Sequence, residues 1–365
     1  MKSHFLLYAA ALLALPAVFG LQNQWQIPAL AAQVPAAPTP PAPACATAQG
    51  LARVVCRAEA LKATLTPGQV ALVQLPYSKA DAAKWSNFPQ RFSRPQRVGL
   101  SLGALSAPQL AAAKALLAAV LAPGMPNEGY DELEGGLAAD DYLGTATKQT
   151  DTFGRGNYYL ALLGTPSLTG RWELQYGGHH FALANTYAGG KVAGVTPAFR
   201  GVEPMTAVAA HGRTYAPMAQ EQQAFAALLG SLSSSQAATA RLGTAFHDVV
   251  LGPGQDGQFP AARQGLRVGS LSAAQQQLVL RALRLYVNDL EPATAAPILA
   301  AYTAQLADTY LAFVGSGTMR QASDYVRLDG PRLWLEYSAQ ASRDFPGTVH
   351  PHSVWRDRTS DYGGR

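Results

Sequence analysis

The fold is decided by the stretch GLSLGALS at residues 99–106, which is echoed by GLRVGSLS at residues 265–272. A helix is predicted after each copy, over 107–122 and 273–290, with Ser106 and Ser272 as the caps. A serine at the start of a helix accepts a hydrogen bond from one of the backbone amides that the helix leaves free. The shared position of cap and helix indicates that one structural unit occurs twice.

Further matches flank the two copies in the same order. A single match carries little weight because Gly, Leu and Ser are common in the chain, but six matches keep one order at offsets of about 150 to 170 residues. Together they indicate an internal duplication. Besides the two copies, the matches pair Leu65 and Gln69 with Leu232 and Gln236, Phe88-Pro89 with Phe259-Pro260, residues 159–164 with 310–315, residues 174–176 with 335–337, and two doublets of histidines.

Each half is predicted to begin with helices and to end with an antiparallel sheet. Residues 171–187 and 326–337 have the aromatic and β-branched content and the near-alternation that are typical of strands. A helix is predicted over 291–313, because apolar residues recur there at helical spacing: Leu299, Tyr302, Leu306, Tyr310 and Phe313. The predicted class is α+β, built as two tandem pseudo-repeats.

The chain divides into four predicted segments: a signal peptide at 1–31, a Pro/Ala-rich linker at 32–48, a first α+β half at 49–215, and a second half at 216–365 that packs on the first as one globular unit. The leader has a short basic start and an uncharged apolar stretch from Phe5 to Gly20, with cleavage points after Gly20 or Ala31. An uncleaved membrane anchor is the alternative, but about 16 apolar residues are short for a span of roughly 20. We therefore expect export to the periplasm or the exterior, with no membrane span after leader removal.

Composition excludes two classes of partner. The 365 residues are 48% hydrophobic and 14% charged, and the net charge of +5 includes no run of Lys or Arg. Such a run is the footprint of nucleic-acid or anionic-membrane binding, so neither partner is expected. The two cysteines, Cys45 and Cys56, both lie in the exported part, where an oxidising compartment favours a disulfide between them; two free thiols are the alternative.

Four of the six histidines beyond the leader form two doublets, His179-His180 and His350-Pro351-His352. Closely spaced imidazoles are a common way to bind a transition metal such as zinc, copper or iron in a chain with few cysteines. Carboxylates that could join them are Glu203, Asp357 and Asp361. The alternative interpretation is that these are core or surface histidines hydrogen-bonded to the backbone.

The spacing within each doublet predicts how its rings point. Residues two apart in a strand share a face, so His350 and His352 are expected to project together. His179 and His180 are adjacent, and the preceding Gly177-Gly178 pair is a natural place for a β-bulge. On this interpretation they face opposite sides, and only one of them joins the other doublet.

Several motifs resemble the domain-of-unknown-function family 3500. They are Trp85 with Phe88-Pro89 ahead of Gly99-Leu100, Tyr158-Tyr159 leading to Gly164-Thr165-Pro166, GHHFAL at 178–183, TPAFRGVEP at 196–204, and the ending His350-x-His352 with WRD at 355–357 and DYGG at 361–364. The resemblance covers most of the chain from about Leu61 onward and implies a bacterial-type exported protein without an established activity. One departure is FALAN after the histidine pair, where the family pattern has HLSLN.

Two functional hypotheses follow. The first is a metal-handling protein or a metal-dependent exported enzyme, such as a hydrolase or an oxidoreductase. Its ligands are His350 and His352 with His179 or His180, and Glu203 or Asp357 is the base that acts on a metal-bound water. The second is a non-catalytic extracytoplasmic protein whose aromatic-rich cleft binds a small molecule or a peptide. Imidazoles more than about 10 Å apart would exclude the first, because metal–nitrogen distances are near 2 Å.

Overall fold

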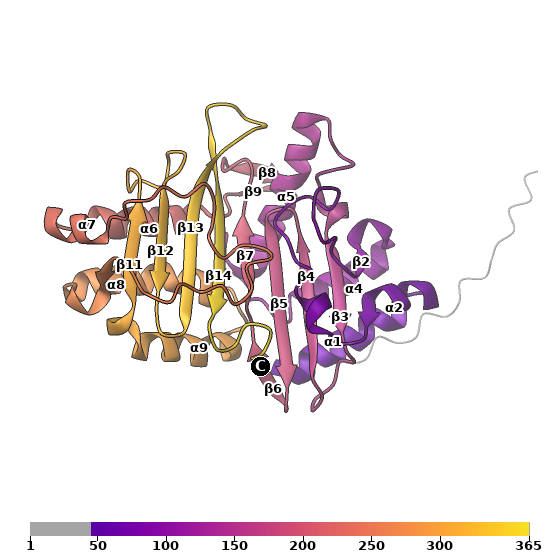
Figure 1. Ribbon diagram of the computed structural model, residues 1–365. Helices are drawn as coiled ribbons and strands as arrows, with labels where there is room; N and C mark the ends of the chain where they lie inside the picture. The colour runs from indigo at the N-terminus through magenta and orange to yellow at the C-terminus, as the bar shows by residue number, and fades with distance from the viewer. Residues whose placement is uncertain (1–44, 365) are drawn as a thin grey trace, which may run out of the picture. The chain divides into compact units, whose positions relative to one another are not determined.

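A mixed sheet of twelve strands runs through residues 45–364, the part of the chain that the computed structural model describes (Figure 1). The predicted signal peptide and most of the predicted linker lie outside these residues. The strand order is β1-β3-β4-β5-β7-β14-β13-β12-β11-β10, with β2 beside β3 and β6 beside β5. The strands are β1 (Gln74–Leu75), β2 (Leu100–Ser101), β3 (Tyr159–Leu163), β4 (Trp172–Gly178), β5 (Phe181–Ala188), β6 (Lys191–Gly194), β7 (Ala198–Gly201), β10 (Leu266–Arg267), β11 (Tyr310–Val314), β12 (Tyr325–Asp329), β13 (Leu333–Ala341) and β14 (Val349–Asp357).

The two predicted halves both contribute to this sheet. β1 to β7 come from residues before 216 and β10 to β14 from residues after it, and β7 pairs antiparallel with β14 where the two sets meet. β1 lies parallel to β3, which makes the sheet mixed. The α+β class is therefore confirmed, but the expectation of a separate closing sheet in each half is wrong: the strands form one sheet. A small hairpin of β8 (Val208–Ala210) and β9 (Arg213–Tyr215) stands apart from it.

Helices α4 and α8 begin at the serine caps that the sequence predicts. Ser272 caps α8 and exchanges hydrogen bonds with Gln275, and Ser106 caps α4, where its backbone amide donates to the Gln109 side chain. These capping boxes satisfy amides that the first helical turn leaves free. The helices are α1 (Gly50–Thr64), α2 (Pro67–Val73), α3 (Lys79–Ala82), α4 (Ala107–Leu117), α5 (Gly129–Thr147), α6 (Ala219–Gly230), α7 (Ser234–Ala240), α8 (Ala273–Val287) and α9 (Pro292–Ala304), with short 3-10 turns at 102–104, 155–157, 268–270 and 306–308.

The helix predicted over 291–313 is wrong in its second half. α9 ends at Ala304, and Tyr310 and Phe313 belong to strand β11. The helical spacing of apolar residues continues across the boundary by coincidence. β11 lies between β10 and β12 in the sheet, and pairing on both edges together with the burial of Leu311 and Phe313 outweighs a local helical pattern.

The longer helices cover one face of the sheet, and long connections together with the short helix α3 cover the other (Figure 1). On β14, the Trp355 ring packs edge-on against Tyr302 of α9, with the ring centroids 6.2 Å apart. Val354 points the opposite way and joins a core with Trp85 from the connection between α3 and β2. Because alternate residues of a strand share a face, His350 and His352 belong to the side of Val354, away from the helices.

The predicted disulfide between Cys45 and Cys56 is confirmed, and it closes a loop of 11 residues at the start of α1. Among residues 45–364, no helix combines the length and the apolarity that a membrane crossing needs.

Candidate metal centre

His179 and His180 form the two-residue turn of the hairpin between β4 and β5, where Gly178 pairs with Phe181. The predicted β-bulge is therefore wrong, because the chain reverses direction and this reversal shifts the apolar pattern. The two rings do not face opposite sides: they stack, with centroids 3.7 Å apart. His180 has a φ of 62°, a conformation that side chains other than Gly and Asn rarely adopt.

The strand register brings His180 to the second doublet. β7 lies between β5 and β14, with Arg200 opposite Phe181 and Gly201 opposite His352. One step further along, His180 lies on the other side of Gly201. A Cβ added to Gly201 would lie 2.7 Å from the carbonyl oxygen of Pro351 and 3.3 Å from the Cβ of His180. Glycine at this position thus leaves room for imidazoles from the β4–β5 turn and from β14 to meet.

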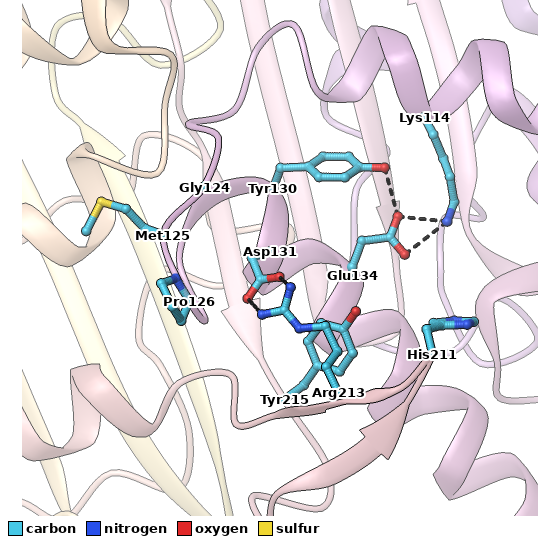
Figure 2. A pocket seen from close by; sticks show the side chains of 10 residues that line it. All are labelled: Lys114, Gly124, Met125, Pro126, Tyr130, Asp131, Glu134, His211, Arg213 and Tyr215. Carbon is cyan, nitrogen blue, oxygen red and sulfur yellow. Dashed lines mark hydrogen bonds and ion pairs between the residues drawn. The ribbon is translucent and has the colours of Figure 1, made fainter.

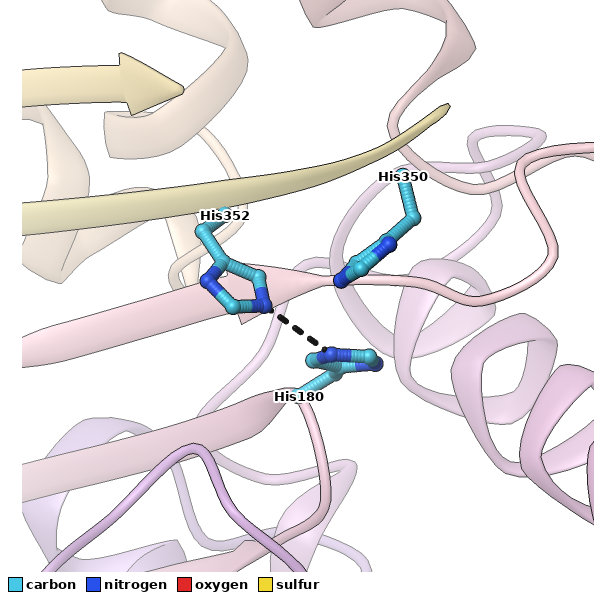
Figure 3. A group of neighbouring side chains, drawn as sticks. All are labelled: His180, His350 and His352. Atoms are coloured by element: carbon cyan, nitrogen blue, oxygen red, sulfur yellow. Dashed lines mark hydrogen bonds between the residues drawn. The ribbon is translucent and has the colours of Figure 1, made fainter. Parts of the chain in front are cut away.

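Three imidazoles converge in this space (Figure 3). One ring nitrogen from each of His180, His350 and His352 lies within 4.8 Å of the others, and the Nε2 atoms of His180 and His352 are 3.1 Å apart. Ligands about 2.0–2.1 Å from a tetrahedral zinc ion are about 3.3 Å from one another. The spacing therefore suits nitrogens that share one ion, and all three side chains are buried.

Glu203 and His179 extend the group on one side. His179, His180 and Glu203 form a second set whose ligand atoms lie within 4.8 Å of one another. Glu203 follows β7, accepts a hydrogen bond of 2.5 Å from Ser342 Oγ, and lies 3.5 Å from His350 Nδ1. Burial raises the pKa of Glu203. The site thus has a carboxyl group within reach of the converging nitrogens.

Carboxylates also lie behind two of the imidazoles. Asp248 Oδ1 is 2.9 Å from His352 Nδ1, and Asp140 Oδ1 is 2.6 Å from His179 Nδ1. Such a carboxylate fixes the tautomer and orientation of a metal-binding histidine, and leaves its other nitrogen free for the ion. Asp140 and Asp248 were not predicted from the sequence, because each is brought to its histidine only by tertiary contacts.

Burial also sets the protonation state of the cluster. It lowers the pKa of His180 well below its usual range and that of His350 to about 3, with the neighbouring histidines adding to the effect. Both rings are therefore neutral near pH 7, which is the form that binds a metal. Among residues 45–364, His350 Nδ1 has no hydrogen-bond partner although it is buried.

The histidines open into a cavity of about 290 Å³. Phe88, Phe92 and Phe153 form an aromatic part of its wall, and Arg343 and Asp344 form a charged part. Phe88 and Phe92 are 53% and 57% exposed, so they stand at the mouth. The cavity joins a polar end, formed by the histidines, to an apolar rim.

A larger cavity of about 560 Å³ lies elsewhere, beside the N-terminal part of α5 (Figure 2). Its charged side chains pair with one another: Lys114 with Glu134 at 2.8 Å, and Arg213 with Asp131 at 2.6 Å. Because these charges are already compensated within the cavity, we assign the candidate site to the histidine cluster.

The structure does not bring Asp357 or Asp361 to the histidines. Asp357 lies five positions after His352 on β14, so it points to the helix-covered face, where it accepts a hydrogen bond from Tyr302 and pairs with Arg332 at 2.9 Å. Asp361 pairs with Arg356 at 3.1 Å. Of the two bases considered from the sequence, only Glu203 lies within the histidine cluster.

Comparison with known proteins identifies a family, but it assigns no activity. The family model described as "Protein of unknown function (DUF3500)" matches residues 47–364, a range that contains all of the site residues above. Neither the curated proteins nor the solved structures contain a match to the chain.

Proposed function

Because this chain belongs to the DUF3500 family, a family of proteins of unknown function, we propose its function from the site itself. The protein binds one transition-metal ion through His180, His350 and His352. The observation that carries this proposal is the convergence of three buried imidazoles, one nitrogen each, within 4.8 Å. Three protein nitrogens with an open fourth position are a typical catalytic zinc site, while copper and iron also accept imidazole.

The activity that suits this ligand set is hydrolysis. A transition metal held by these three histidines would supply Lewis acidity, which lowers the pKa of a bound water. Glu203 would accept the proton, because it lies beside His350 and burial raises its pKa, which makes it a stronger base. Asp357 has no part in this scheme, since its hydrogen bonds tie it to the opposite face of the sheet. Oxidoreductase chemistry would replace hydrolysis if the bound metal is copper or iron.

The second candidate is a non-catalytic protein that binds a small molecule or a peptide. The aromatic rim of Phe88 and Phe92 supports it, because exposed apolar side chains at the mouth of a cavity mark a binding surface. This candidate has no need of the metal, so metal content separates the two.

Export is part of the proposal. The uncharged apolar stretch after Lys2 has the composition of a secretory leader. The disulfide between Cys45 and Cys56 supports it, since disulfides persist in oxidising compartments.

An internal duplication is also proposed, with a revised alignment. Leu100 pairs with Leu160 as Leu266 pairs with Leu311, and Gln69 meets Gln109 as Gln236 meets Gln275. These equivalent contacts in the two halves support two copies of one structural unit.

The strand pairing also indicates that the strands matched by sequence in the two halves are not the structurally equivalent ones. Leu160 pairs with Tyr176 and Leu311 with Leu328, so β4 corresponds to β12 and not to β13. The His179-His180 turn therefore corresponds to the turn between β12 and β13, whereas His350 and His352 lie on β14. The two doublets do not occupy equivalent places, as the sequence match had suggested, and the site combines different parts of the two halves.

Elemental analysis of the exported protein, purified without an affinity tag, tests the metal proposal. We expect about one transition-metal ion per chain, and its loss in a His350→Ala/His352→Ala double variant. A matched control is His211→Ala/His247→Ala, which removes two exposed histidines and should keep the metal. Absence of metal from the wild type, or retention of metal by the first double variant, would contradict the proposal.

A further inference from the structure

Asn87 is an unpaired polar side chain in the wall of the histidine cavity. The residue is 3% exposed, and its Oδ1 has no hydrogen-bond partner within residues 45–364. The great majority of buried polar atoms in native proteins have a partner. An amide left without one beside a cavity indicates that the partner is a molecule that enters the cavity.

The backbone holds Asn87 next to the candidate ligand His180. The carbonyl oxygen of Asn87 accepts a hydrogen bond of 3.0 Å from the His180 amide. Arg97 holds the backbone around Asn87 in place. Its buried guanidinium donates to the carbonyl oxygens of Ser86, Phe88 and Gly178. Because the backbone is held and the terminal torsion of Asn is soft, the side-chain amide can turn toward the cavity without moving the chain.

The next residues along the same segment supply an apolar surface. Phe88 directly follows Asn87, and Phe92 lies one turn further; both line the cavity and are more than half exposed. Exposed aromatic rings at a cavity mouth favour a flat apolar ligand that stacks on them. Phe153 adds a third ring, packed 4.9 Å from the His179 ring between centroids.

We propose that the site takes a small molecule with a planar apolar body, held by Phe88 and Phe92, and a neutral amide-type head group that pairs with Asn87 beside the metal. A side-chain amide has a carbonyl acceptor and an N–H donor, so it complements the donor and acceptor of another amide. An anionic head group would instead pair with Arg343, and a cationic one with Glu203, Asp248 or Asp344, which also line the cavity. The volume of about 290 Å³ fits a molecule of this size.

This inference rests on the proposed function only where it concerns the reaction: a metal held by the three histidines would supply a Lewis acid beside the head group. Binding itself is measured separately from metal content. The two proposals can therefore fail independently.

The probe is benzamide, titrated into the full exported chain with and without added zinc, with binding followed by ligand-observed NMR. We expect benzamide to bind the wild type more tightly than benzoate or toluene do. Asn87→Ala should weaken benzamide about three- to tenfold, the effect of one neutral hydrogen bond. Phe88→Ala/Phe92→Ala should weaken benzamide and toluene alike.

Matched controls lie outside the cavity. Asn288→Ala removes an exposed asparagine and Leu168→Ala an exposed apolar side chain, and both should bind benzamide as the wild type does. Asn87→Ser is the second variant if Asn87→Ala does not fold. Zinc content should be unchanged in all five variants.

Four results would overturn the inference: no binding of benzamide, equal binding by wild type and Asn87→Ala, equal affinity for toluene and benzamide, or preference for benzoate, with or without loss of that binding in Arg343→Ala. The last result would assign the site to a carboxylate ligand. Equal affinity for toluene and benzamide would show that Asn87 is paired only by water.

Discussion

The Nε2 atoms of His180 and His352 lie 3.1 Å apart although 172 residues separate the two histidines along the chain. Their backbones are two strand spacings apart, each of about 4.8 Å, because Gly201 of β7 lies between the two histidines. Without an ion, one ring donates an N–H to the other nitrogen; in the proposed metal site, both nitrogens would bind the ion. The relationship makes His180 the link between the first-half hairpin and β14.

We predict that His180→Asn abolishes metal binding and leaves the fold intact. Asparagine tolerates the positive φ of this turn, so the backbone keeps its conformation while the third imidazole is lost. Elemental analysis and the thermal midpoint, measured on the same sample, check the two halves of the prediction. His247→Asn, which changes an exposed histidine one residue before Asp248, should keep the metal. A His180→Asn protein with a full complement of metal would show that His180 is not a ligand.

Asp248→Asn should weaken metal binding about 10- to 100-fold, the usual effect of removing the carboxylate behind a histidine ligand. The loss arises because Asp248 Oδ1 orients the ring of His352 through Nδ1 at 2.9 Å. Competition with a chelator of known affinity measures it. Asp151→Asn is the control, since the Asp151 side chain is 76% exposed in a surface ion pair. Equal affinities of the two variants would contradict a role for Asp248.

Gly201→Ala should lower both stability and metal affinity. The new methyl group would lie 2.7 Å from the backbone oxygen of Pro351, so β7 and β14 must move apart, at a cost of about 1–3 kcal/mol. Chemical denaturation gives the free energy of unfolding. Gly136→Ala in α5 is a control that should raise stability. Nothing lies within 4 Å of its added Cβ, and alanine favours a helix interior. A Gly201→Ala protein as stable as the wild type would show that β7 and β14 accommodate the added methyl group without loss of stability.

The sequence predicted the parts of this site that depend on local spacing. His350 and His352 share a face because alternation within one strand is a local property, and Cys45 and Cys56 pair because they are close along the chain. The capping serines of α4 and α8 were likewise visible in the sequence.

The parts that depend on long-range pairing were not predictable. The His179-His180 turn was interpreted as a bulged strand, because a hairpin and a bulge shift the apolar alternation in the same way. Asp140 and Asp248 meet their histidines over separations of 39 and 104 residues. Their roles are set by the packing of α5 and of the connection before β10 onto the sheet, which no local pattern encodes.

A second buried group, on the helix-covered face, makes stability depend on pH. Glu221 of α6 is 1% exposed, and burial, with the nearby Asp289, raises its pKa from 4.5 to about 8. The positive charge of Arg200 of β7 lowers the pKa of Glu221, which opposes this shift. Arg200 also pairs with Glu132 at 3.2 Å, so its charge is shared between the two carboxyl groups. The ionisable groups that face this cluster from the surrounding elements are Glu128 and Glu132 of the α5 start, Tyr286 and Asp289 of the α8 end, Arg200 of β7 and Tyr337 of β13.

Because the folded state holds a proton on Glu221 that the unfolded state releases above about pH 4.5, the stabilising effect of that proton is complete below this pH and falls as the pH rises through 8. We predict that Glu221 alone lowers the free energy of unfolding of the metal-free protein by about 2–4 kcal/mol between pH 5 and pH 8.5. Glu221→Gln keeps the shape of the neutral side chain and cannot ionise, so its stability should fall less than that of the wild type over the same range. The fall that remains in Glu221→Gln comes from Glu128 and Glu132, whose pKa values burial also raises. Urea unfolding of both proteins at a series of pH values in the presence of a chelator measures the difference. Parallel pH profiles for wild type and Glu221→Gln would show that Glu221 does not carry the proton.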